Sequence, residues 1–290
     1  MRVLILGANG YIGKRIGRYL EENGHIVVKA IRNIQSQGQG LPERVVEAEL
    51  ASIRDDICRN GCDWIINCAV RYEGNGIAIH EIVDANMIYA LKVLSCAVEL
   101  GVKNFLTFDT SLPKELNLYS FTKKTFADFG KFYSERYGIN FTNVVLEMFY
   151  GEDEPENRFL VRCCRTMLKG EELLLTKGTQ KRDVIYINDV CEAVRILLKS
   201  SLNGFHDVPL GSGEAVQLRV LLEYMHKVLG SKSKLYFGAM PMRKEEPDCI
   251  ADITLLKKYG FVVRYPWKLG IEQLCKKLRM EGEDGATGIF

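Results

Sequence analysis

The stretch LILGANGYIG occupies residues 4–13. It reads as an apolar strand that ends in three glycines, Gly7, Gly10 and Gly13, followed by apolar residues at helical spacing. Glycine lets the backbone turn tightly, approach a neighbour closely and pack a helix against a strand. A strand, a glycine turn and a helix in this order are typical of a site that binds the diphosphate of a dinucleotide at the helix N-terminus.

The chain after this turn alternates between apolar strands and helices. Continuous apolar strands separated by helices indicate a parallel sheet with helices on both faces. The sequence therefore predicts an α/β protein with a doubly wound parallel sheet, the Rossmann arrangement. The predicted strands lie at 2–6, 25–31, 44–50, 63–69, 103–109 and 138–147, and the predicted helices at 12–23, 52–60, 80–100 and 119–137.

The order of elements changes after Tyr150, where a polar loop, EDEPEN at 152–157, is followed by short elements. We predict a dinucleotide-binding domain over 1–150, to which later segments can return, and mainly a smaller C-terminal substrate-binding lobe over 151–290. A substrate is expected in the cleft between them. The elements predicted here are helices at 158–169, 217–229 and 254–258, another helix from about 188, and strands at 173–176, 183–187 and 234–237.

Composition limits the partners. The 290 residues are 47% hydrophobic, and 39 basic residues against 37 acidic ones give a net charge of +2. Basic runs with interleaved aromatic residues are missing from the sequence, so we expect a small-molecule ligand and no nucleic acid. The strand MRVLIL begins the sequence directly, and no apolar run reaches the roughly 18 residues of a membrane span. We therefore expect a cytoplasmic protein without membrane contact.

The nine cysteines lie mostly in apolar, periodic segments. There a thiol acts as a small hydrophobic group, which suits a reducing compartment. The sequence has no Cys-x-x-Cys pair and only four histidines, so we expect no metal site.

The end of the second strand predicts which dinucleotide binds. An acidic residue there accepts hydrogen bonds from the ribose of NAD, whereas an arginine suits the 2′-phosphate of NADP. Here the sequence is Ile31-Arg32-Asn33, without an acid. This favours NADP(H), while NAD(H) stays an alternative because a solvated surface arginine is common.

Tyr119 and Lys123 form a Tyr-x-x-x-Lys pair, which a helix places on one face. With 13 tyrosines and 21 lysines in the chain, about one such pair is expected by chance. The pair therefore indicates a function only through its position relative to the predicted strands. The pair closely follows the strand that ends in Asp109, Thr110 and Ser111, at the carboxyl edge of the predicted sheet, where such folds bind ligands. An adjacent ammonium lowers the pKa of a phenol, which can then exchange a proton with a carbonyl or alcohol oxygen, while a hydroxyl orients that oxygen.

Together, the segment GANGYIG at 7–13, the segment NCA at 67–69 and the residues Thr110, Tyr119 and Lys123 resemble the extended short-chain dehydrogenase/reductases, the NAD-dependent epimerase/dehydratase family. The resemblance covers nearly the whole chain. It implies that Tyr119 is the general acid/base, that Lys123 binds the nicotinamide ribose and tunes Tyr119, and that Thr110 hydrogen-bonds the reacting oxygen. The glycine turn, the end of the second strand and this resemblance together predict which residues bind the cofactor. These are Gly7, Asn9, Gly10, Tyr11, Ile12, Gly13, Arg32, Glu49, Leu50, Asn67, Cys68, Ala69, Val70 and Lys123.

The second half resembles the part of the family that binds the substrate. LTKGTQKRDVIYINDV at 175–190 is similar to a segment in which an arginine, here Arg182, holds the diphosphate of a nucleotide sugar. The C-terminal segment would supply Arg243 as a second contact, and two arginines suit a clamp on phosphate oxygens. Ser111, Met148 and Phe159 are the remaining expected substrate contacts, and Ser111 could replace Thr110.

Departures from the family pattern narrow the expected chemistry. Ser111-Leu112 follows Thr110, where the 4,6-dehydratases carry Asp-Glu, so dehydration is not expected. The short loop from Thr110 to Tyr119 and the pair Glu147-Met148 in VVLEMFYGEDE resemble the reductases of the abequose/paratose synthase type, which act on CDP- or dTDP-linked 4-keto-6-deoxyhexoses. Such an enzyme of deoxysugar biosynthesis would consume NADPH.

Three functions therefore stay open. The first is NAD(P)H-dependent reduction of the C4 keto group of a nucleotide-diphospho-4-keto-6-deoxy sugar. The second is a nucleotide-sugar 4-epimerase that retains NAD, and the third is a non-catalytic dinucleotide sensor. The resemblance also implies a homodimer that pairs the helices at 80–100 and 119–137.

Overall fold

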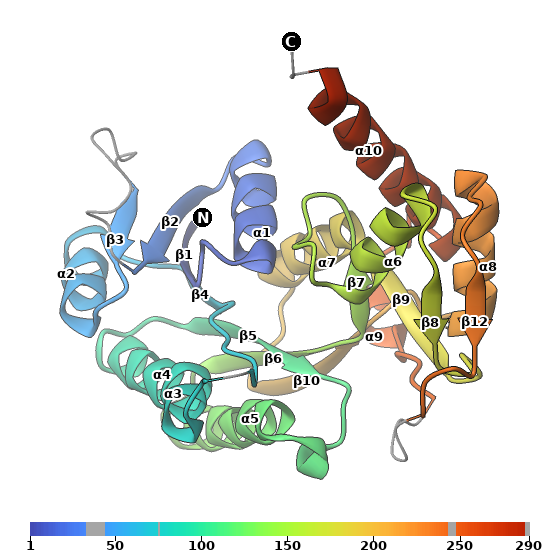
Figure 1. Ribbon diagram of the computed structural model, residues 1–290. Helices are drawn as coiled ribbons and strands as arrows, with labels where there is room; N and C mark the ends of the chain where they lie inside the picture. Colours follow the sequence, from blue (N-terminus) through green and yellow to red (C-terminus); the bar gives the residue numbers. More distant parts are fainter. Residues whose placement is uncertain (33–43, 75, 243–247, 288–290) are drawn as a thin grey trace. The chain divides into compact units, whose positions relative to one another are not determined.

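The computed structural model describes residues 1–32, 44–74, 76–242 and 248–287, with side chains described up to residue 281. The chain divides into two compact units (Figure 1). The first contains Met1–Leu146 and Ala193–Pro209, and the second contains Glu147–Glu192 and Leu210–Phe290. The first unit thus includes a segment from late in the chain.

A seven-stranded sheet organises the first unit, in the order β10-β6-β5-β4-β1-β2-β3. All of its strands from β6 to β3 pair in parallel, which confirms the predicted α/β fold. The strands are β1 (Arg2–Leu6), β2 (Ile26–Ile31), β3 (Val45–Glu47), β4 (Trp64–Asn67), β5 (Asn104–Thr110), β6 (Asn140–Leu146) and β10 (Phe205–Leu210). The helices are α1 (Tyr11–Glu22), α2 (Leu50–Asn60), α3 (Ile79–Val83), α4 (Tyr89–Glu99) and α5 (Leu118–Tyr137), with a π-helical turn η2 (Asp84–Ile88) and a 3-10 turn η3 (Lys114–Leu116).

Alternate residues of the strands point to opposite faces of this sheet. Leu4 and Leu6 of β1 join a buried cluster with residues of α2, α4 and α5. On the other face, Ile5 and Val27 contact α1, where a Cβ added to Gly17 would lie 3.5 and 3.7 Å from them. Figure 1 shows α3, α4 and α5 together along one side of the sheet. Helices therefore cover both faces, as the doubly wound arrangement requires.

Aromatic packing sets the distance between α5 and the sheet. The rings of Phe105 and Phe141 are stacked with centroids 5.4 Å apart, and Phe126 of α5 packs edge-on against both. A Cβ added to Gly130 would lie 2.2 Å from the ring of Phe141, so only glycine lets the helix come this close. This contact fixes α5, which carries Tyr119 and Lys123, against β5 and β6.

The second unit has two small sheets and its own apolar core. In one sheet β9 pairs in parallel with β7 and antiparallel with β11, and in the other β12 pairs in parallel with β8. The strands are β7 (Met148–Tyr150), β8 (Leu173–Leu175), β9 (Lys181–Tyr186), β11 (Ala215–Gln217) and β12 (Leu235–Phe237). The helices are α6 (Phe159–Leu168), α8 (Leu218–Leu229), α9 (Thr254–Lys258) and α10 (Trp267–Thr287), while α7 (Ile187–Lys199) crosses from this unit into the first.

The structure corrects several predicted elements. The strand expected at 44–50 is shorter, because α2 already begins at Leu50. The helix expected at 80–100 is interrupted by the π-helical turn η2. Sequence analysis missed β7, β11 and, in the large sheet, β10, which contains Pro209 and polar residues. An edge strand tolerates proline because one side of it needs no ladder hydrogen bonds.

Helix α10 was also missed, although its buried residues Trp267, Ile271, Leu274 and Leu278 recur at helical spacing. Gly270 interrupts the pattern in its first turn. A Cβ added to Gly270 would lie 2.2 Å from the hydroxyl oxygen of Tyr150, which itself donates a hydrogen bond to the carbonyl of Trp267. The glycine therefore serves packing and does not end the helix.

Candidate active site

The glycine turn after β1 is built from backbone. Gly7 has φ of +70°, a conformation that favours glycine, and its carbonyl accepts a hydrogen bond of 2.9 Å from the amide of Gly10. Gly10 is the extended N-cap of α1, which begins at Tyr11 without a side-chain cap and without an acidic residue in its first turn. The positive end of the helix dipole is therefore not compensated locally, as an anion site requires.

Two of the glycines are needed for backbone-to-backbone contacts. A Cβ on Gly7 would lie 2.7 Å from the backbone of Ala69, and one on Gly13 would lie 2.4 Å from the carbonyl oxygen of Gly7. Because β1 pairs with β4, with Leu6 opposite Asn67, the turn lies against the segment that follows β4. The structure thus brings Gly7 together with Ala69, and the cradle that these glycines form fits the diphosphate of a dinucleotide.

Asn67 shapes the second wall of this cradle. Its side chain is fully buried at the end of β4, where Nδ2 donates to Thr107 Oγ1 at 3.1 Å. The amide of Ala69 donates to Asn67 Oδ1 at 3.2 Å. Asn67 therefore fixes the turn that carries Cys68 and Ala69, and Val70 beyond them is exposed.

The other residues expected to bind the cofactor lie around the same strand ends. Arg32 directly follows β2 and is exposed. Glu49 is the N-cap of α2 and Leu50 its first residue, and both are exposed. Asn9 is exposed in the glycine turn, and Tyr11 and Ile12 form the start of α1. Whether these residues contact a cofactor stays a prediction.

A capping box fixes the start of α5 and hence the position of Tyr119. Asn117 Oδ1 accepts the amide of Ser120 at 2.8 Å, and Ser120 Oγ accepts the amide of Asn117 at 3.3 Å. The amide of Leu118 donates to the carboxylate of Glu73 at 2.9 Å. Tyr119 is consequently the second residue of a firmly capped helix, and Lys123 lies one turn further on.

The segment 71–73 packs against Tyr119, a contact that sequence analysis missed. The rings of Tyr72 and Tyr119 have centroids 4.9 Å apart with an interplanar angle of 34°. Buried Asn86 of η2 holds this segment: its Oδ1 accepts the amide of Arg71 at 2.7 Å, and its Nδ2 donates to the carbonyl of Arg71 at 3.0 Å. The same Nδ2 donates to Thr122 Oγ1 at 3.2 Å, so the π-helical turn joins the segment to α5.

Lys123 is a buried ammonium. Only 4% of the residue is exposed. Burial lowers the pKa of Lys123 to about 8, against the opposing effect of the charges of Asp109 and Cys68. A lysine with this pKa still carries charge at neutral pH, and a charge in such a buried place acts strongly on a neighbouring phenol.

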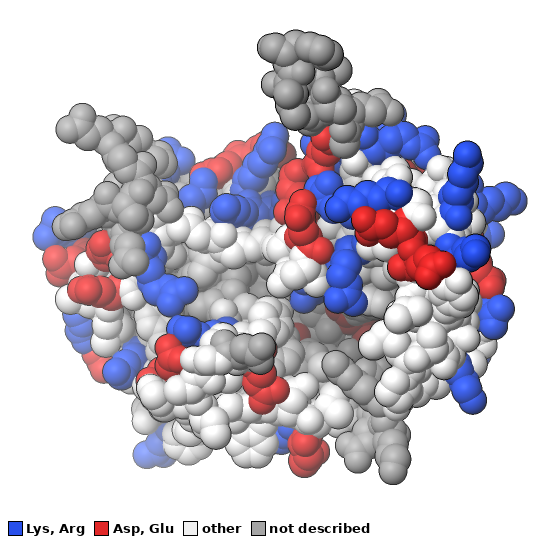
Figure 2. All heavy atoms as spheres, viewed as in Figure 1, with Lys and Arg blue, Asp and Glu red and all other residues white. Residues whose placement is uncertain are grey.

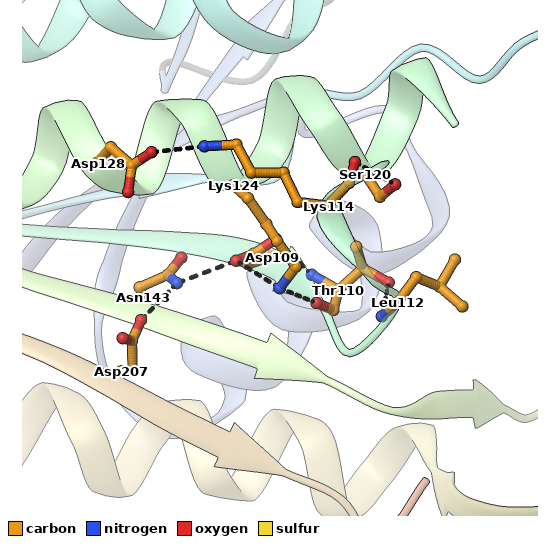
Figure 3. Close-up of polar contacts among 9 residues, drawn as sticks. All are labelled: Asp109, Thr110, Leu112, Lys114, Ser120, Lys124, Asp128, Asn143 and Asp207. Carbon is orange, nitrogen blue, oxygen red and sulfur yellow. Dashed lines mark hydrogen bonds and ion pairs between the residues drawn. The ribbon is translucent and has the colours of Figure 1, made fainter. Parts of the chain in front are cut away.

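Thr110 ends β5, and α5 contacts it directly. Lys124 Nζ donates to the carbonyl of Thr110 at 2.9 Å, as Figure 3 shows. Thr110 Oγ1 accepts the amide of Leu112 at 3.2 Å, which forms a tight turn that leaves Ser111 half-buried. The structure therefore brings the strand end with Thr110 and the helix with Lys123 together.

Three residues that are expected to bind the substrate lie in the described part of the second unit. Each of them is at or next to the start of a short helix or strand. Met148 begins β7 and pairs with Val184, and Phe159 begins α6. Arg182 of β9 pairs with Val216 and is half-buried, while its neighbour Asp183 accepts hydrogen bonds from Ser212, Gly213 and Ala251. Arg243 lies outside the described residues.

The surface carries both signs of charge. Figure 2 shows Lys and Arg side chains intermixed with Asp and Glu side chains on the described part of the visible face. Within the residues that the structure describes, no helix combines the length and apolarity that crossing a membrane would need. Nor do three His, Cys, Asp or Glu side chains of this part of the chain gather as metal ligands would.

The sequence matches the NAD dependent epimerase/dehydratase family over residues 3–211. The match spans well over half of the chain, and the chain belongs to this family. It is an NAD(P)-dependent enzyme of the oxidoreductase and epimerase class.

Two similar relatives extend over nearly the full length of the chain. CDP-abequose synthase of Salmonella typhimurium is 29% identical, over 95% of this chain and 98% of that protein. CDP-abequose synthase of Salmonella muenchen is 26% identical, over 94% of this chain and 96% of that protein.

Solved structures share the fold at lower identity. UDP-glucose 4-epimerase of Thermotoga maritima, determined with UDP-glucose, is 18% identical with a TM-score of 0.83, over 97% of this chain and 99% of that one. UDP-glucose 4-epimerase of Thermus thermophilus, determined in complex with NAD, is 19% identical with a TM-score of 0.79, over 96% of this chain and 99% of that one. These likenesses confirm the Rossmann fold.

Proposed function

We propose that this protein reduces the C4 keto group of a nucleotide-diphospho-4-keto-6-deoxy sugar with NADPH. The observation that carries this proposal is the similarity to CDP-abequose synthases over nearly the whole length of both chains. Ser111 and Leu112 agree with it, because dehydration would need an acid and a base directly after Thr110.

The proposed chemistry depends on three residues. Tyr119 donates its phenolic proton to the carbonyl oxygen of the sugar as that carbon is reduced. Lys123 holds its charge beside the phenol and favours the phenolate that remains. Thr110 donates a hydrogen bond to the same oxygen and stabilises the charge that develops there. The nicotinamide cofactor, when bound, supplies the hydride.

The cofactor in this proposal is NADPH, held by the turn at Gly7–Gly13 and the wall at Asn67–Val70. Arg32 supports this choice, since it is exposed directly after β2, where a 2′-phosphate would lie. A reductase that consumes one NADPH for each turnover also releases its cofactor, in contrast to an enzyme that retains NAD.

The substrate in this proposal is bound through its diphosphate by Arg182 and Arg243. Ser111, Met148 and Phe159 would line the sugar. The names of the relatives favour a cytidine nucleotide. Arginine suits a diphosphate because its planar guanidinium can donate two parallel hydrogen bonds to phosphate oxygens.

A substrate screen tests the proposal. The purified protein is mixed with CDP-, dTDP-, GDP- or UDP-linked 4-keto-6-deoxy sugars, and the loss of NADPH absorbance is followed, with NADH in parallel. We expect turnover with a CDP-linked substrate and a preference for NADPH. If none of these sugars causes NADPH loss while the protein binds NADPH, the reductase proposal is wrong.

A second candidate is a nucleotide-sugar 4-epimerase. The observation in its favour is the set of structural neighbours, several of which are 4-epimerases of UDP-sugars. Such an enzyme would purify with NAD tightly bound and would interconvert C4 epimers without net consumption of NADPH. Product analysis of the same screen distinguishes the two reactions.

A further inference from the structure

Asp109 is a buried acid that the proposed chemistry leaves without a function. It precedes Thr110 in β5, and only 5% of the residue is exposed. Its Oδ1 accepts the amide of Thr110 at 2.7 Å, and its Oδ2 accepts Asn143 Nδ2 at 3.1 Å. Lys124 Nζ lies 3.6 Å from the same Oδ2 (Figure 3). A carboxylate is buried only where such partners compensate its charge.

The partners of Asp109 come from three elements of the first unit, namely β5 itself, β6 and α5. Asn143 of β6 also donates to the carboxylate of Asp207 in β10 at 2.7 Å, so its amide is held between two acids. Lys124 of α5 spans the carboxylate of Asp109 and the carbonyl of Thr110. The end of β5 is thus fastened to the strand beside it and to the helix above it.

The charge of Asp109 also acts on Lys123. Burial disfavours the charged form of Lys123, whereas the charges of Asp109 from β5 and Cys68 from the segment after β4 favour it. Tyr119, one turn earlier, and Lys124, the next residue, lie on the same helix α5. Asp109 is the carboxylate among the groups that favour the charged form of Lys123. Asp109 therefore touches Thr110 directly and acts on Lys123 through its charge.

We propose that Asp109 is a positioning residue of this site: its carboxylate fixes the strand end that carries Thr110 and balances the buried ammonium of Lys123. The proposal rests on the reductase function proposed above, because it assigns Asp109 to the support of that reaction. Asp109 makes no contact with the reacting atoms in this scheme and acts through its two neighbours.

Removing the charge of Asp109 has a defined effect on pH dependence. Without the carboxylate, burial lowers the pKa of Lys123 further, because the larger of the two charges that oppose the effect of burial is lost. Reduction requires a charged Lys123 beside a protonated Tyr119, so activity falls as pH rises through the pKa of Lys123. The alkaline limb of the profile should therefore move to lower pH.

The substitution that tests this is Asp109→Asn, which keeps the shape and one acceptor oxygen. We expect kcat to fall and the alkaline limb of the kcat profile to move down by about one pH unit, with a smaller change in KM. The matched control is Asp128→Asn. Asp128 lies on α5 too, but it is exposed and pairs with Lys114. The alkaline limb of the kcat profile of Asp128→Asn should therefore stay where it is in the wild type. An unmoved limb in folded Asp109→Asn overturns the proposal.

Lys124→Met provides a second variant with the opposite sign. It removes the ammonium that pairs with the carboxylate of Asp109, so more of that negative charge is left to favour charged Lys123, and the alkaline limb of the kcat profile should move to higher pH. This variant tests the role of Asp109 even if Asp109→Asn does not fold. A limb in Lys124→Met that moves down or does not move contradicts the proposal.

Stability against pH tests Asp109 without any turnover. The pKa of Lys123 is lowered from 10.5 to about 8 in the folded protein, so the unfolded chain binds more protons between these values and stability rises with pH there. In Asp109→Asn the rise should begin at a lower pH than in the wild type, measured by urea unfolding. If this shift occurs but no substrate turns over, the charge balance stands and the reductase function fails. If turnover occurs without any shift, Asp109 does not have the role proposed here.

Discussion

Two regions of the first unit are positioned by different means. One is the glycine turn at 7–13, and the other is the β5–α5 site, which consists of Asp109 and Thr110 at the end of β5 and Tyr119 and Lys123 on α5. The turn consists of backbone atoms, and its shape depends on the missing side chains of Gly7 and Gly13. The β5–α5 site consists of buried side chains whose partners lie far away in the sequence, such as Asp109 with Asn143. A site made of backbone can therefore be recognised in a short stretch of sequence, whereas a site made of buried charged groups depends on the packing of the whole sheet.

The largest effect is expected at Tyr119, if the β5–α5 site performs the chemistry and the turn only binds. Tyr119→Phe removes the phenolic proton and keeps the ring that packs on Tyr72. We expect kcat to fall by about 10²–10⁴-fold, while NADPH affinity stays close to that of the wild type. Stopped-flow turnover and NADPH fluorescence titration measure the two. Full turnover in this variant would instead favour a non-catalytic dinucleotide-binding protein.

The next largest effect is expected in the turn, where Gly13→Ala would place a methyl group 2.4 Å from the carbonyl oxygen of Gly7. Backbone must move to relieve this contact, at a cost of about 1–3 kcal/mol in stability. Because the moved backbone is the expected diphosphate site, we expect the Kd for NADPH to rise at least about tenfold, which corresponds to about 1.4 kcal/mol.

Gly17→Ala is the matched control in the same helix. A Cβ there would make ordinary contacts of 3.5 Å or more, so the higher helix propensity of alanine should leave the melting temperature equal or higher. Thermal unfolding and NADPH titration of both variants give the comparison. Equal affinity for NADPH in Gly13→Ala and Gly17→Ala would remove the turn from the binding site.

The smallest effect is expected at Tyr72, which supports Tyr119 from the side. Tyr72→Ala removes a ring contact worth about 0.5–1.5 kcal/mol, so we expect kcat to fall several-fold. Tyr72→Phe keeps the ring and should retain most of the activity. Steady-state kinetics of the two variants measure the difference. Equal kcat for Tyr72→Ala and the wild type would show that the capping box alone is sufficient to orient Tyr119.

Much of the first unit could be predicted because local patterns carry it. Apolar strands and helical spacing gave β1, β2, β4, β5 and β6 within a few residues, since each strand is buried on both faces. Strand β10 could not be predicted in this way, because it is an edge strand with Pro209 and exposed Asp207. Helix α10 did carry a helical pattern that sequence analysis overlooked, and the packing of Gly270 against Tyr150 is visible only in the structure.

Spacing along the chain is enough to specify the glycine turn, the parallel sheet and the pair Tyr119 and Lys123 on one helix face. The surroundings of that pair depend instead on how distant elements pack together. The buried ammonium of Lys123, the buried carboxylate of Asp109 and the ring of Tyr72 beside Tyr119 come from separate elements. Burial and charge are properties of the packed sheet and helices, and no short stretch of sequence records them.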